Sequence, residues 1–476
     1  MKSTLNIDAE PPLVEECGPA LEPCDVFLRL AGRPHCLFLD SALRETALGR
    51  YSFVAADPFG FVESRIECPD SIAELAARLA ALTVVAVPDL PPFQGGAAGL
   101  FSYDLARQLE RLPAPRHDEF GLPAMAVGLY DVVVAFDHAR RQSWIISQGL
   151  PETEPGARRR RARERLRQFR AWLSEPPPAS PSRSNRGLDS LAADQLITRH
   201  AVEGPTGLAS NFSRSEYLAT VCRAIDYIQA GDIFQVNLSQ RLLFPAHDDT
   251  VSLYLRLRQR NAAPFAAYFD LGAFQIASAS PERFLSVKGR QVEARPIKGT
   301  RRRSSSPEAD LFAGDELRES EKDRAENIMI VDLLRNDLSR VCRPESVHVS
   351  ELCRREVYRY VQHLVSVVRG HLSDDVGPLD LIRATFPGGS VTGAPKIRAM
   401  EIIAELEPSA RGAYCGALGY MGFDGSMDTS ILIRTITAGR GWWQAPVGGG
   451  IVAQSSPAHE YAETWHKAEG LLQALT

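Results

Sequence analysis

Three glutamates stand in patterns that could bind a divalent cation. Glu326 lies in KDRAENIMIVDLL on the helical face that also carries Ile330, so its carboxylate is expected to point inward. Glu460 and Glu463 share one face of a predicted C-terminal helix with Lys467. Carboxylates from two helices could hold Mg²⁺, which prefers oxygen ligands. The spacing alone favours the alternative of an exposed stripe with a Glu463–Lys467 ion pair.

Lys298 is a candidate nucleophile. It lies in RPIKGT and is followed by arginines at positions 301–303. Neighbouring cations and partial desolvation both disfavour an ammonium group, so this amine could become neutral and reactive. An ordinary surface lysine in a basic turn is the commoner explanation of such a string, and the residues alone favour it.

Two glycine-rich strings could bind anions. Gly448, Gly449 and Gly450 offer backbone N–H groups, although a glycine run more often forms a turn. The string FPGGSVTGAPK resembles a phosphate-binding loop, but Lys396 is followed by Ile397 where that motif requires serine or threonine. The sequence therefore does not predict an ATP site.

Secondary-structure signals place these residues on helices and strands. Ser213 and Glu216 form a capping box at the start of an amphipathic helix. Residues 234–239 alternate between apolar and polar side chains, as a strand does. We expect a long helix over about 322–342 and a last helix beginning at Ser456 and Pro457. Short strands are expected between about 20 and 150. The pattern predicts an α+β fold with long antiparallel sheets and flanking helices.

The composition limits the possible classes of function. The chain has 476 residues, a formal net charge of -5 and a pI of about 6.1, so its overall field does not favour nucleic acid or an anionic membrane. No apolar stretch is long enough to span a membrane, and no signal peptide is evident. The eight cysteines show neither disulfide nor zinc spacing. We therefore expect a cytoplasmic protein with reduced thiols.

An arginine-rich segment, residues 157–173, precedes a Pro/Ser-rich string. Its apolar residues follow helical spacing, and the string after it is typical of a linker. The arginines could bind nucleic acid. A solvated helix face next to a linker is the interpretation we favour, because the protein as a whole is acidic.

Many of these strings resemble the chorismate-utilising enzyme family, which includes anthranilate, aminodeoxychorismate, isochorismate and salicylate synthases. The matching strings include AGDIFQVNLSQR, SASPERFL, RPIKGT, KDRAENIMIVDLLRNDLSRVC, FPGGSVTGAPKIRAMEIIAELEP, RGAYCGALGY, DTSILIRT and GGGIVAQSSPAHEYAETWHKAE. GRYSFVAADP and PPFQGGAAGLFSYDLAR extend the resemblance toward the N-terminus. It implies large antiparallel sheets that form an interleaved two-domain sandwich. The expected parts are an N-terminal domain at 1–155, an arginine-rich segment and linker at 156–210, and a chorismate-binding catalytic domain at 211–476.

The resemblance also implies roles for individual residues. Glu326 and Glu463 would ligate Mg²⁺, with Glu460 joined through water, and the metal would hold the ring carboxylate of chorismate. The resemblance implies that His363 is a catalytic residue. The residues that it implies in substrate binding are Arg434, Lys467, Gly449, Gly450, Thr385 and Gln235, and His363 and Thr385 match family positions that line the pocket near the reacting ring. A guanidinium suits a dianionic substrate, because it stays charged and donates two coplanar hydrogen bonds.

Single residues indicate which reaction the chain would catalyse. Isochorismate and salicylate synthases have a water-activating lysine where this chain has Gln235, and an amide cannot serve as a general base. Anthranilate synthases have alanine at the position of Lys298, whereas aminodeoxychorismate synthases have lysine. The resemblance therefore implies amination at C4, on the route to 4-aminobenzoate and folate. Lys298 would add at C2, and Glu282 would protonate the leaving C4 hydroxyl. Amination at C2 is the alternative, and a non-catalytic amino-acid or nucleic-acid binding protein is the second alternative.

Two further expectations concern partners. We find no glutaminase motif around Cys415, so the resemblance implies a separate glutamine amidotransferase that supplies ammonia. Asp40 and Ser41, together with the string NAAPF, resemble the tryptophan pocket of anthranilate synthases. Feedback-inhibited enzymes have glutamate where this chain has Asp40. A bound tryptophan, an empty vestige of that pocket and plain core packing remain open.

Overall fold

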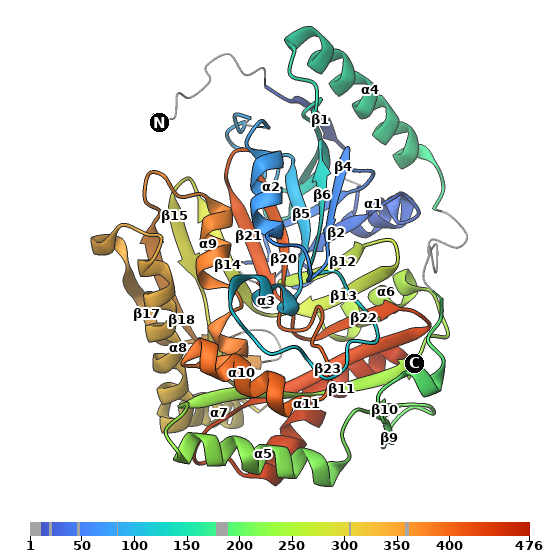
Figure 1. Ribbon diagram of the computed structural model, residues 1–476. Coiled ribbons are helices and arrows are strands. Elements are labelled where there is room, and N and C mark those ends of the chain that lie inside the picture. Colours follow the sequence, from blue (N-terminus) through green and yellow to red (C-terminus); the bar gives the residue numbers. More distant parts are fainter. Residues whose placement is uncertain are drawn as a thin grey trace.

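The computed structural model describes residues 11–18, 21–44, 48–82, 84–177, 189–303, 306–357 and 361–476. Two large antiparallel sheets with helices around them make up this part of the chain (Figure 1). One sheet has 13 strands and the other has 10. Phe53 of the first sheet packs against Tyr420 of the second, with ring centroids 5.6 Å apart, inside a core shared by both sheets. The predicted fold class is confirmed.

The first sheet combines strands from both ends of the chain. Its order is β1-β8-β7-β3-β2-β12-β13-β22-β23-β11-β10-β9, and β19 pairs with β11. The bounds are β1 Leu13–Cys17, β2 Leu37–Asp40, β3 Tyr51–Ala55, β7 Val132–Asp137, β8 Gln142–Ser147, β9 His200–Ala201, β10 Ala209–Ser210, β11 Gln235–Pro245, β12 Phe265–Asp270, β13 Phe274–Ser280, β19 Gly393–Ala394, β22 Thr435–Gly439 and β23 Trp442–Ile451.

The second sheet is interleaved in the same way. Its order is β16-β18-β15-β14-β21-β20-β5-β6-β4, and β17 pairs with β18. The bounds are β4 Gly60–Ser64, β5 Gly96–Phe101, β6 Met125–Tyr130, β14 Arg283–Lys288, β15 Gln291–Ala294, β16 Ile297–Arg302, β17 His348–Val357, β18 Val361–His371, β20 Ala417–Gly422 and β21 Met427–Ile431. Strand β2 pairs with β12, and β5 pairs with β20, so N-terminal strands join C-terminal ones in both sheets.

The helices have the following bounds: α1 Pro23–Leu30, α2 Ser71–Leu79, η1 Tyr103–Leu105, α3 Ala106–Leu109, α4 Pro155–Ser174, η2 Ala193–Gln195, α5 Arg214–Gln229, α6 Thr250–Arg260, α7 Pro307–Glu319, α8 Glu321–Ser339, η3 Pro344–Ser346, α9 Pro378–Thr385, η4 Gly389–Val391, α10 Lys396–Leu406 and α11 Pro457–Leu475. Ser213 and Glu216 form the expected capping box before α5. Ser456 is the N-cap of α11, and Pro457 is its first residue, as predicted.

The two helices that carry the candidate acids pack on different sheets. Helix α8 lies on β18 and buries Ile330 and Leu334 against the core of the second sheet. Helix α11 lies on β23 of the first sheet and buries Ala468 and Leu471. The acidic faces of α8 and α11 can therefore meet only where the two sheets adjoin.

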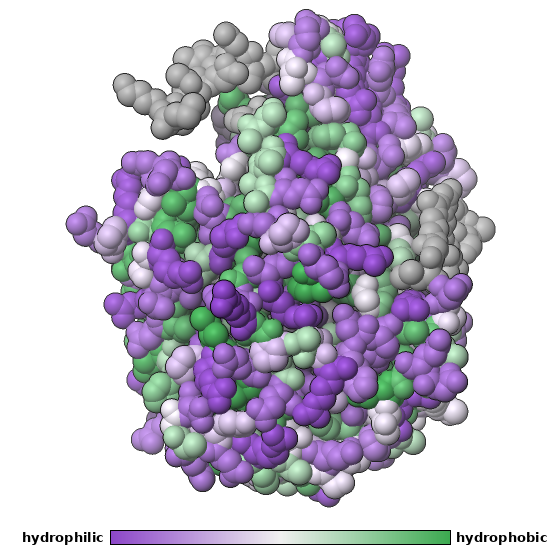
Figure 2. Space-filling view, viewed as in Figure 1, coloured by the Kyte–Doolittle hydropathy of each residue, from purple (hydrophilic) through white to green (hydrophobic). Residues whose placement is uncertain are grey.

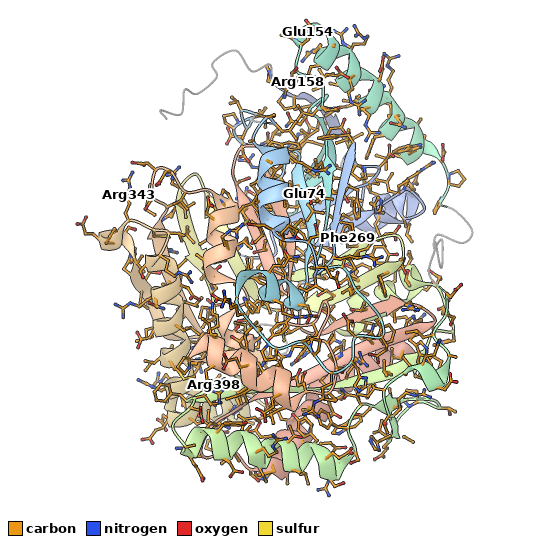
Figure 3. The ribbon with its side chains drawn as sticks, viewed as in Figure 1. Glu74, Glu154, Arg158, Phe269, Arg343 and Arg398 are labelled. Carbon is orange, nitrogen blue, oxygen red and sulfur yellow. The ribbon has the colours of Figure 1, made fainter. Side chains whose placement is uncertain are left out.

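The arginine-rich segment forms α4, but not as a simple solvated face. Arg158, which is labelled in Figure 3, donates from Nε to Gln148 O at 2.9 Å. Arg165 pairs with Asp131 and Asp57. These arginines attach the helix to the body of the protein because their partners are buried or half-buried acceptors. Figure 2 shows a largely hydrophilic outer surface on this helix. The predicted linker after it lies mostly outside the described residues.

The state of the cysteines and the hydrophobicity of the helices are also seen in the structure. All eight cysteines lie in the described ranges and are free thiols. Among the described residues, no helix is both long and apolar enough to cross a bilayer.

Candidate functional site

Acidic and basic side chains gather beside Gly449 on β23. A Cβ atom at that position would lie 3.3 Å from Glu460 Oε2, 3.6 Å from Glu463 Oε1 and 3.7 Å from Lys467 Nζ. Lys467 Nζ also donates to the carbonyl oxygen of Gly448 at 2.9 Å. The glycine run is thus part of a strand and not a turn, and the missing side chain leaves the space that these charged groups border.

The next glycine brings in two further elements. A Cβ atom at Gly450 would lie 2.5 Å from Gln235 Nε2 and 3.7 Å from Glu326 Oε2. Gln235 comes from β11, which pairs with β23, and Glu326 comes from α8. The structure therefore places Glu326, Glu460 and Glu463 beside the same two glycines, and their role as Mg²⁺ ligands stays a prediction.

Lys322 lies between two of these acids. Its Nζ is 3.5 Å from Glu460 Oε1 and 3.9 Å from Glu326 Oε1. The other Glu460 oxygen, Oε2, is buried and has no hydrogen-bond partner among the described residues. An unsatisfied buried carboxylate oxygen is costly, so a cation or a polar ligand there would be stabilised.

The three glutamates suit a hard cation such as Mg²⁺ whose remaining ligands are water and substrate oxygens. No three acidic, histidine or cysteine side chains among the described residues meet closely enough to hold a metal by themselves. Mg²⁺ is commonly held by one or two carboxylates plus water and substrate oxygens, so a closed protein cage is not required. Glu463 is an anion that pairs with Lys467, because Lys467 and the neighbouring lysines outweigh the effect of burial and lower its pKa. Glu326, Glu460 and Glu463 therefore fit such a site.

Lys298 and Glu282 both interact with Ser390, and the charge of Lys298 acts on Glu282. Lys298 Nζ donates to the carbonyl oxygen of Ser390 at 3.3 Å, and its charge acts on Glu282, Glu326 and Glu463. The amine is therefore directed toward the acids and not into bulk solvent. Burial raises the pKa of Glu282 to about 7, which makes its carboxyl a proton donor at neutral pH.

The buried Glu282 should make stability depend on pH. Its pKa is raised from 4.5 to about 7, so the folded protein binds more protons than the unfolded chain in that range. The contribution of the protonated Glu282 to the free energy of unfolding is fully present below pH 4.5 and is lost as the pH rises to about 7. The wild type should therefore lose roughly 3 kcal/mol of unfolding free energy over this pH range. Glu282→Gln should not show this loss, because an amide does not ionise.

Urea unfolding of both proteins at about pH 5 and about pH 8 measures this difference. Glu321→Gln, at the exposed start of α8, is the control and should unfold with the same pH dependence as the wild type. The free energies of unfolding of the wild type and of Glu282→Gln could also differ by the same amount at both pH values. That result would contradict the assignment of Glu282 as a buried, protonated acid.

The arginines after Lys298 do not create the positive field that the sequence suggested. Arg301 pairs with Glu316 at 3.0 Å and with Asp323 at 3.3 Å, and Arg303 pairs with Asp310. Their charges are neutralised locally, because α7 and α8 supply these carboxylates. The nearby cation that does act across the site is Lys467, which is coupled electrostatically to Lys298.

Arg434 is positioned as a cation without an acidic partner. It forms no ion pair among the described residues, and its backbone has a left-handed φ of 53°. Such a conformation is uncommon outside glycine and tends to occur at functional sites. Burial lowers its pKa, but a guanidinium remains protonated at neutral pH. Arg434 acts electrostatically on His363, and Glu463 acts on Arg434, so Arg434 borders the same cluster.

His363 and Thr385 differ in how directly they face the site. His363, on β18, is buried, and burial lowers its pKa to about 4, so the ring is neutral at pH 7. Thr385 is fully buried at the end of α9, and its hydroxyl donates to Leu381 O at 2.7 Å. The structure brings His363 near Arg434, whereas the Thr385 hydroxyl is engaged within its own helix. Substrate contact by Thr385 stays a prediction.

Buried polar atoms without partners mark the centre of the site. Among the described residues, both side-chain polar atoms of Gln235, Oε1 of Glu282, Oγ of Ser390 and Oε2 of Glu460 lack a hydrogen-bond partner. Buried polar groups are nearly always paired, so several orphans in one region indicate a polar ligand that completes them. Ser390 was not singled out from the sequence.

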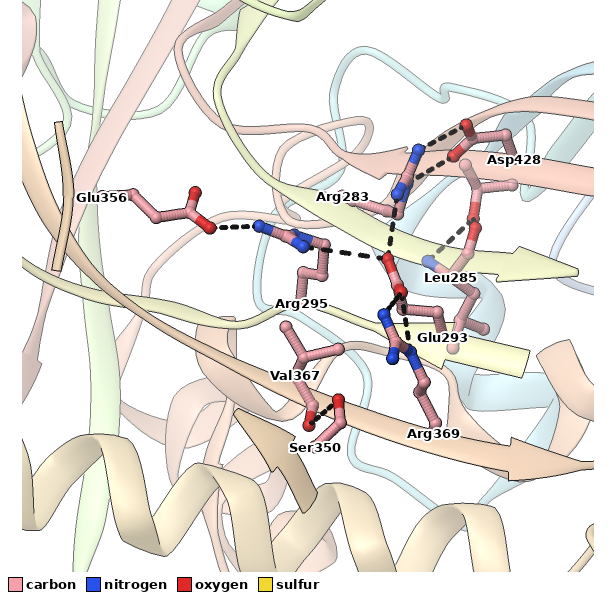
Figure 4. A network of polar contacts seen from close by, with 10 residues as sticks. Arg283, Leu285, Glu293, Arg295, Ser350, Glu356, Val367, Arg369 and Asp428 are labelled. Atoms are coloured by element: carbon pink, nitrogen blue, oxygen red, sulfur yellow. Dashed lines mark hydrogen bonds and ion pairs between the residues drawn. The ribbon is translucent and has the colours of Figure 1, made fainter. Parts of the chain in front are cut away.

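A polar network fixes the strand that follows Glu282. Arg283 donates to both carboxylate oxygens of Asp428 at 2.9 Å, and it pairs with Glu293 at 3.2 Å (Figure 4). Arg369 also pairs with Glu293, at 2.9 Å. The network joins β14, β15, β18 and β21, so the backbone at Glu282 is held on several sides.

The proposed tryptophan pocket has its own internal partners. Asp40 is buried and pairs with Arg258, and it accepts a hydrogen bond from Tyr254 Oη at 3.1 Å. Ser41 Oγ donates to Tyr51 O at 2.6 Å. The Asp40 carboxylate, which would bind the amino group of tryptophan, is thus already paired with Arg258. Tryptophan binding stays a prediction, and this geometry favours an internally filled pocket.

The sequence signature of chorismate-binding enzymes matches residues 44–473. The chain belongs to this family. Anthranilate synthases and aminodeoxychorismate synthases are similar to it over nearly the whole length. It is 40% identical to anthranilate synthase component 1 of Thermus thermophilus over 463 residues, which is 95% of each chain. It is also 40% identical to aminodeoxychorismate synthase component 1 of Salmonella typhimurium over 456 residues, 93% of each chain.

Solved structures of chorismate-binding enzymes share the fold. Anthranilate synthase component I from Streptococcus pneumoniae superposes with a TM-score of 0.74 at 31% identity, covering 90% of this chain and 93% of that one. The menaquinone-specific isochorismate synthase from Escherichia coli gives a TM-score of 0.71 at 17% identity, covering 98% of this chain and 97% of that one. The second likeness concerns the fold alone.

Proposed function

We propose that this chorismate-binding enzyme aminates chorismate at C4, as aminodeoxychorismate synthase component I does, on the route to 4-aminobenzoate. The observation that carries the proposal is the placement of Lys298. Its amine lies against Ser390 O, within electrostatic reach of Glu282 and of the acids of α8 and α11. A nucleophile beside a protonated acid and a carboxylate-binding site is what covalent capture at C2 requires.

In the first step, the lone pair of the Lys298 amine adds to C2 of chorismate, and the nitrogen becomes a secondary ammonium that keeps its protons. The ring double bonds shift, and the C4–oxygen bond breaks. Glu282 donates its proton to the departing hydroxyl, which leaves as water. The raised pKa of Glu282 supports this role, because a carboxyl with a pKa of about 7 keeps its proton in about half of the molecules at neutral pH.

In the second step, ammonia adds at C4 and the double bonds shift back. The bond between C2 and the Lys298 nitrogen breaks, and the amine is regenerated. Glu282 recovers the proton that ammonia loses. Lys298 occupies C2 throughout, so ammonia cannot add there. This is the reason for expecting the C4 product.

The remaining side chains hold the substrate. Arg434, Lys467 and the backbone N–H groups of Gly449 and Gly450 would bind its carboxylates, because cations and N–H donors suit a dianion. Glu326 and Glu463 would hold Mg²⁺, with Glu460 contributing through water. When bound, this metal would withdraw charge from the ring carboxylate and make C2 more electrophilic.

Ammonia requires a source outside this chain. The resemblance to glutamine-dependent synthases supports a separate amidotransferase subunit as the partner. In its absence, ammonium salts should sustain the reaction. Gln235, at the position of the water-activating lysine of isochorismate synthases, argues against water as the nucleophile.

Amination at C2 is the rival function. Relatives of both types reach 40% identity, so overall similarity does not choose between them. Lys298 decides for C4 in this proposal, because the resemblance places alanine there in enzymes that aminate C2.

The test is to incubate the protein with chorismate, Mg²⁺ and an ammonium salt and to separate the products by chromatography. The expected product is 4-amino-4-deoxychorismate. Fluorescent anthranilate as the main product would replace this function with C2 amination. Unchanged chorismate, with tight binding retained, would favour a non-catalytic binding protein.

A further inference from the structure

Ser390 lies at the contact between the proposed nucleophile and the proposed acid. It is the middle residue of the short turn η4 and is 8% exposed. Its carbonyl oxygen accepts the hydrogen bond from Lys298 Nζ at 3.3 Å. Its hydroxyl oxygen is buried and has no hydrogen-bond partner among the described residues.

The Glu282 carboxyl is the second group that interacts with Ser390. Oε1 of Glu282 is also buried without a partner, although the Ser390 side chain is close enough to act on this carboxyl. A hydrogen bond from the Ser390 side chain offsets part of the effect of burial on the pKa of Glu282, so the two groups are neighbours. A hydroxyl can donate and accept, so a small rotation would satisfy both groups.

The turn that carries Ser390 is held rigidly. Arg411 donates to Val391 O at 3.0 Å, and the Thr392 hydroxyl donates to Gly388 O at 3.1 Å. The backbone N–H of Asn237 donates to Thr392 O at 2.8 Å. These bonds tie the turn to β11 and to a buried arginine, so Ser390 has little freedom to move.

Helix α8 also packs against this turn. A Cβ atom at Gly389 would lie only 2.4 Å from Leu333 Cδ2. The backbone at Ser390 thus rests directly on the helix that carries Glu326. Any displacement of the turn would have to move α8 or β11 as well.

We propose that Ser390 is a positioning residue, which orients the Lys298 amine with its carbonyl and the Glu282 carboxyl with its hydroxyl. The inference rests on the proposed function, since it assigns the two groups their roles. One rigid residue then sets the spacing of nucleophile and acid on the reacting ring. Proton donation and covalent attack occur in the same step, so their relative placement governs the rate.

The experiment compares Ser390→Ala, Ser390→Thr and the wild type in steady-state amination with ammonium. Ser390→Ala should lower kcat by on the order of 10- to 100-fold while the KM for chorismate changes little. Ser390→Thr keeps a hydroxyl and should recover part of the lost kcat. Ser64→Ala, a buried serine in β4, is the matched control and should keep the wild-type kcat.

Thermal unfolding and chorismate binding are measured on every variant. A kcat loss in Ser390→Ala with unchanged unfolding and binding, partly restored by threonine, supports positioning. A wild-type kcat in Ser390→Ala would overturn the inference, and so would equal losses in both variants that track lower stability. Failure of the proposed function is seen separately, since the wild type would then give anthranilate or no product.

Discussion

Replacing Lys298 with alanine should abolish formation of 4-amino-4-deoxychorismate, lowering kcat by roughly 10³-fold or more. Removing a positioned general acid or base commonly costs about 10²- to 10⁴-fold, and removal of the covalent nucleophile should cost at least as much. Chorismate should still bind, because the carboxylate-binding groups remain. Traces of anthranilate are expected, since C2 is then free to accept ammonia. Product chromatography with ammonium as the nitrogen source measures both outcomes.

Lys288→Ala is the matched control for this variant. Lys288 ends β14 and is exposed, so the substitution removes the same charge away from the site. It should leave kcat unchanged. Normal C4 amination by Lys298→Ala would exclude the lysine from the mechanism, and with it the physical reason for choosing C4.

Replacing Glu326 with glutamine should weaken Mg²⁺ dependence by on the order of 10- to 100-fold or more. Loss of a group that only supports a metal ligand already costs that much, and Glu326 is proposed as a ligand itself. The substitution keeps the size of the side chain and removes its charge. Mg²⁺ titrations of activity, and direct calorimetric titration in the absence of substrate, give the two affinities.

Glu321→Gln serves as the control here also, because Glu321 is an exposed acid of the same helix. Its Mg²⁺ affinity should match that of the wild type. An unchanged metal titration for Glu326→Gln would remove Glu326 from the ligand set. Since Lys322 contacts both Glu326 and Glu460, its ion pair with Glu460 should persist in the variant.

Local signals in the sequence anticipated the elements of the site well. The capping box at Ser213 fixes one helix start through short-range hydrogen bonds, and Pro457 fixes another through its backbone preference. Helical spacing placed Glu460, Glu463 and Lys467 on one face. The spacing could not tell whether that face was exposed, and the resemblance was needed to reverse the first interpretation.

Long-range pairing was beyond what local patterns reveal. The glycine run at 448–450 has the composition of a turn, yet it is a strand because β11 pairs with it across more than 200 residues of sequence. The arginines at 301 and 303 read as a positive patch, yet acids of α7 and α8 neutralise them. In both cases the deciding partner is distant in sequence.

Ser390 and Lys322 were missed for a related reason. Ser390 lies in FPGGSVTGAPK, which resembles both a phosphate-binding loop and the family, but neither resemblance assigns a role to the serine. Lys322 precedes Glu326 by one helical turn, which alone indicates an ordinary surface ion pair. Their importance comes from Glu282 and Glu460, which the fold brings from other elements.

The pairing of β2 with β12 and of β5 with β20 has a consequence for synthesis of the chain. While the first half leaves the ribosome, the edges of its strands cannot yet be covered, because their neighbours have not been made. Exposed strand edges invite pairing with other chains, and pairings between distant segments form slowly. During translation the nascent chain should therefore depend on chaperones until its last strands, β22 and β23, are available.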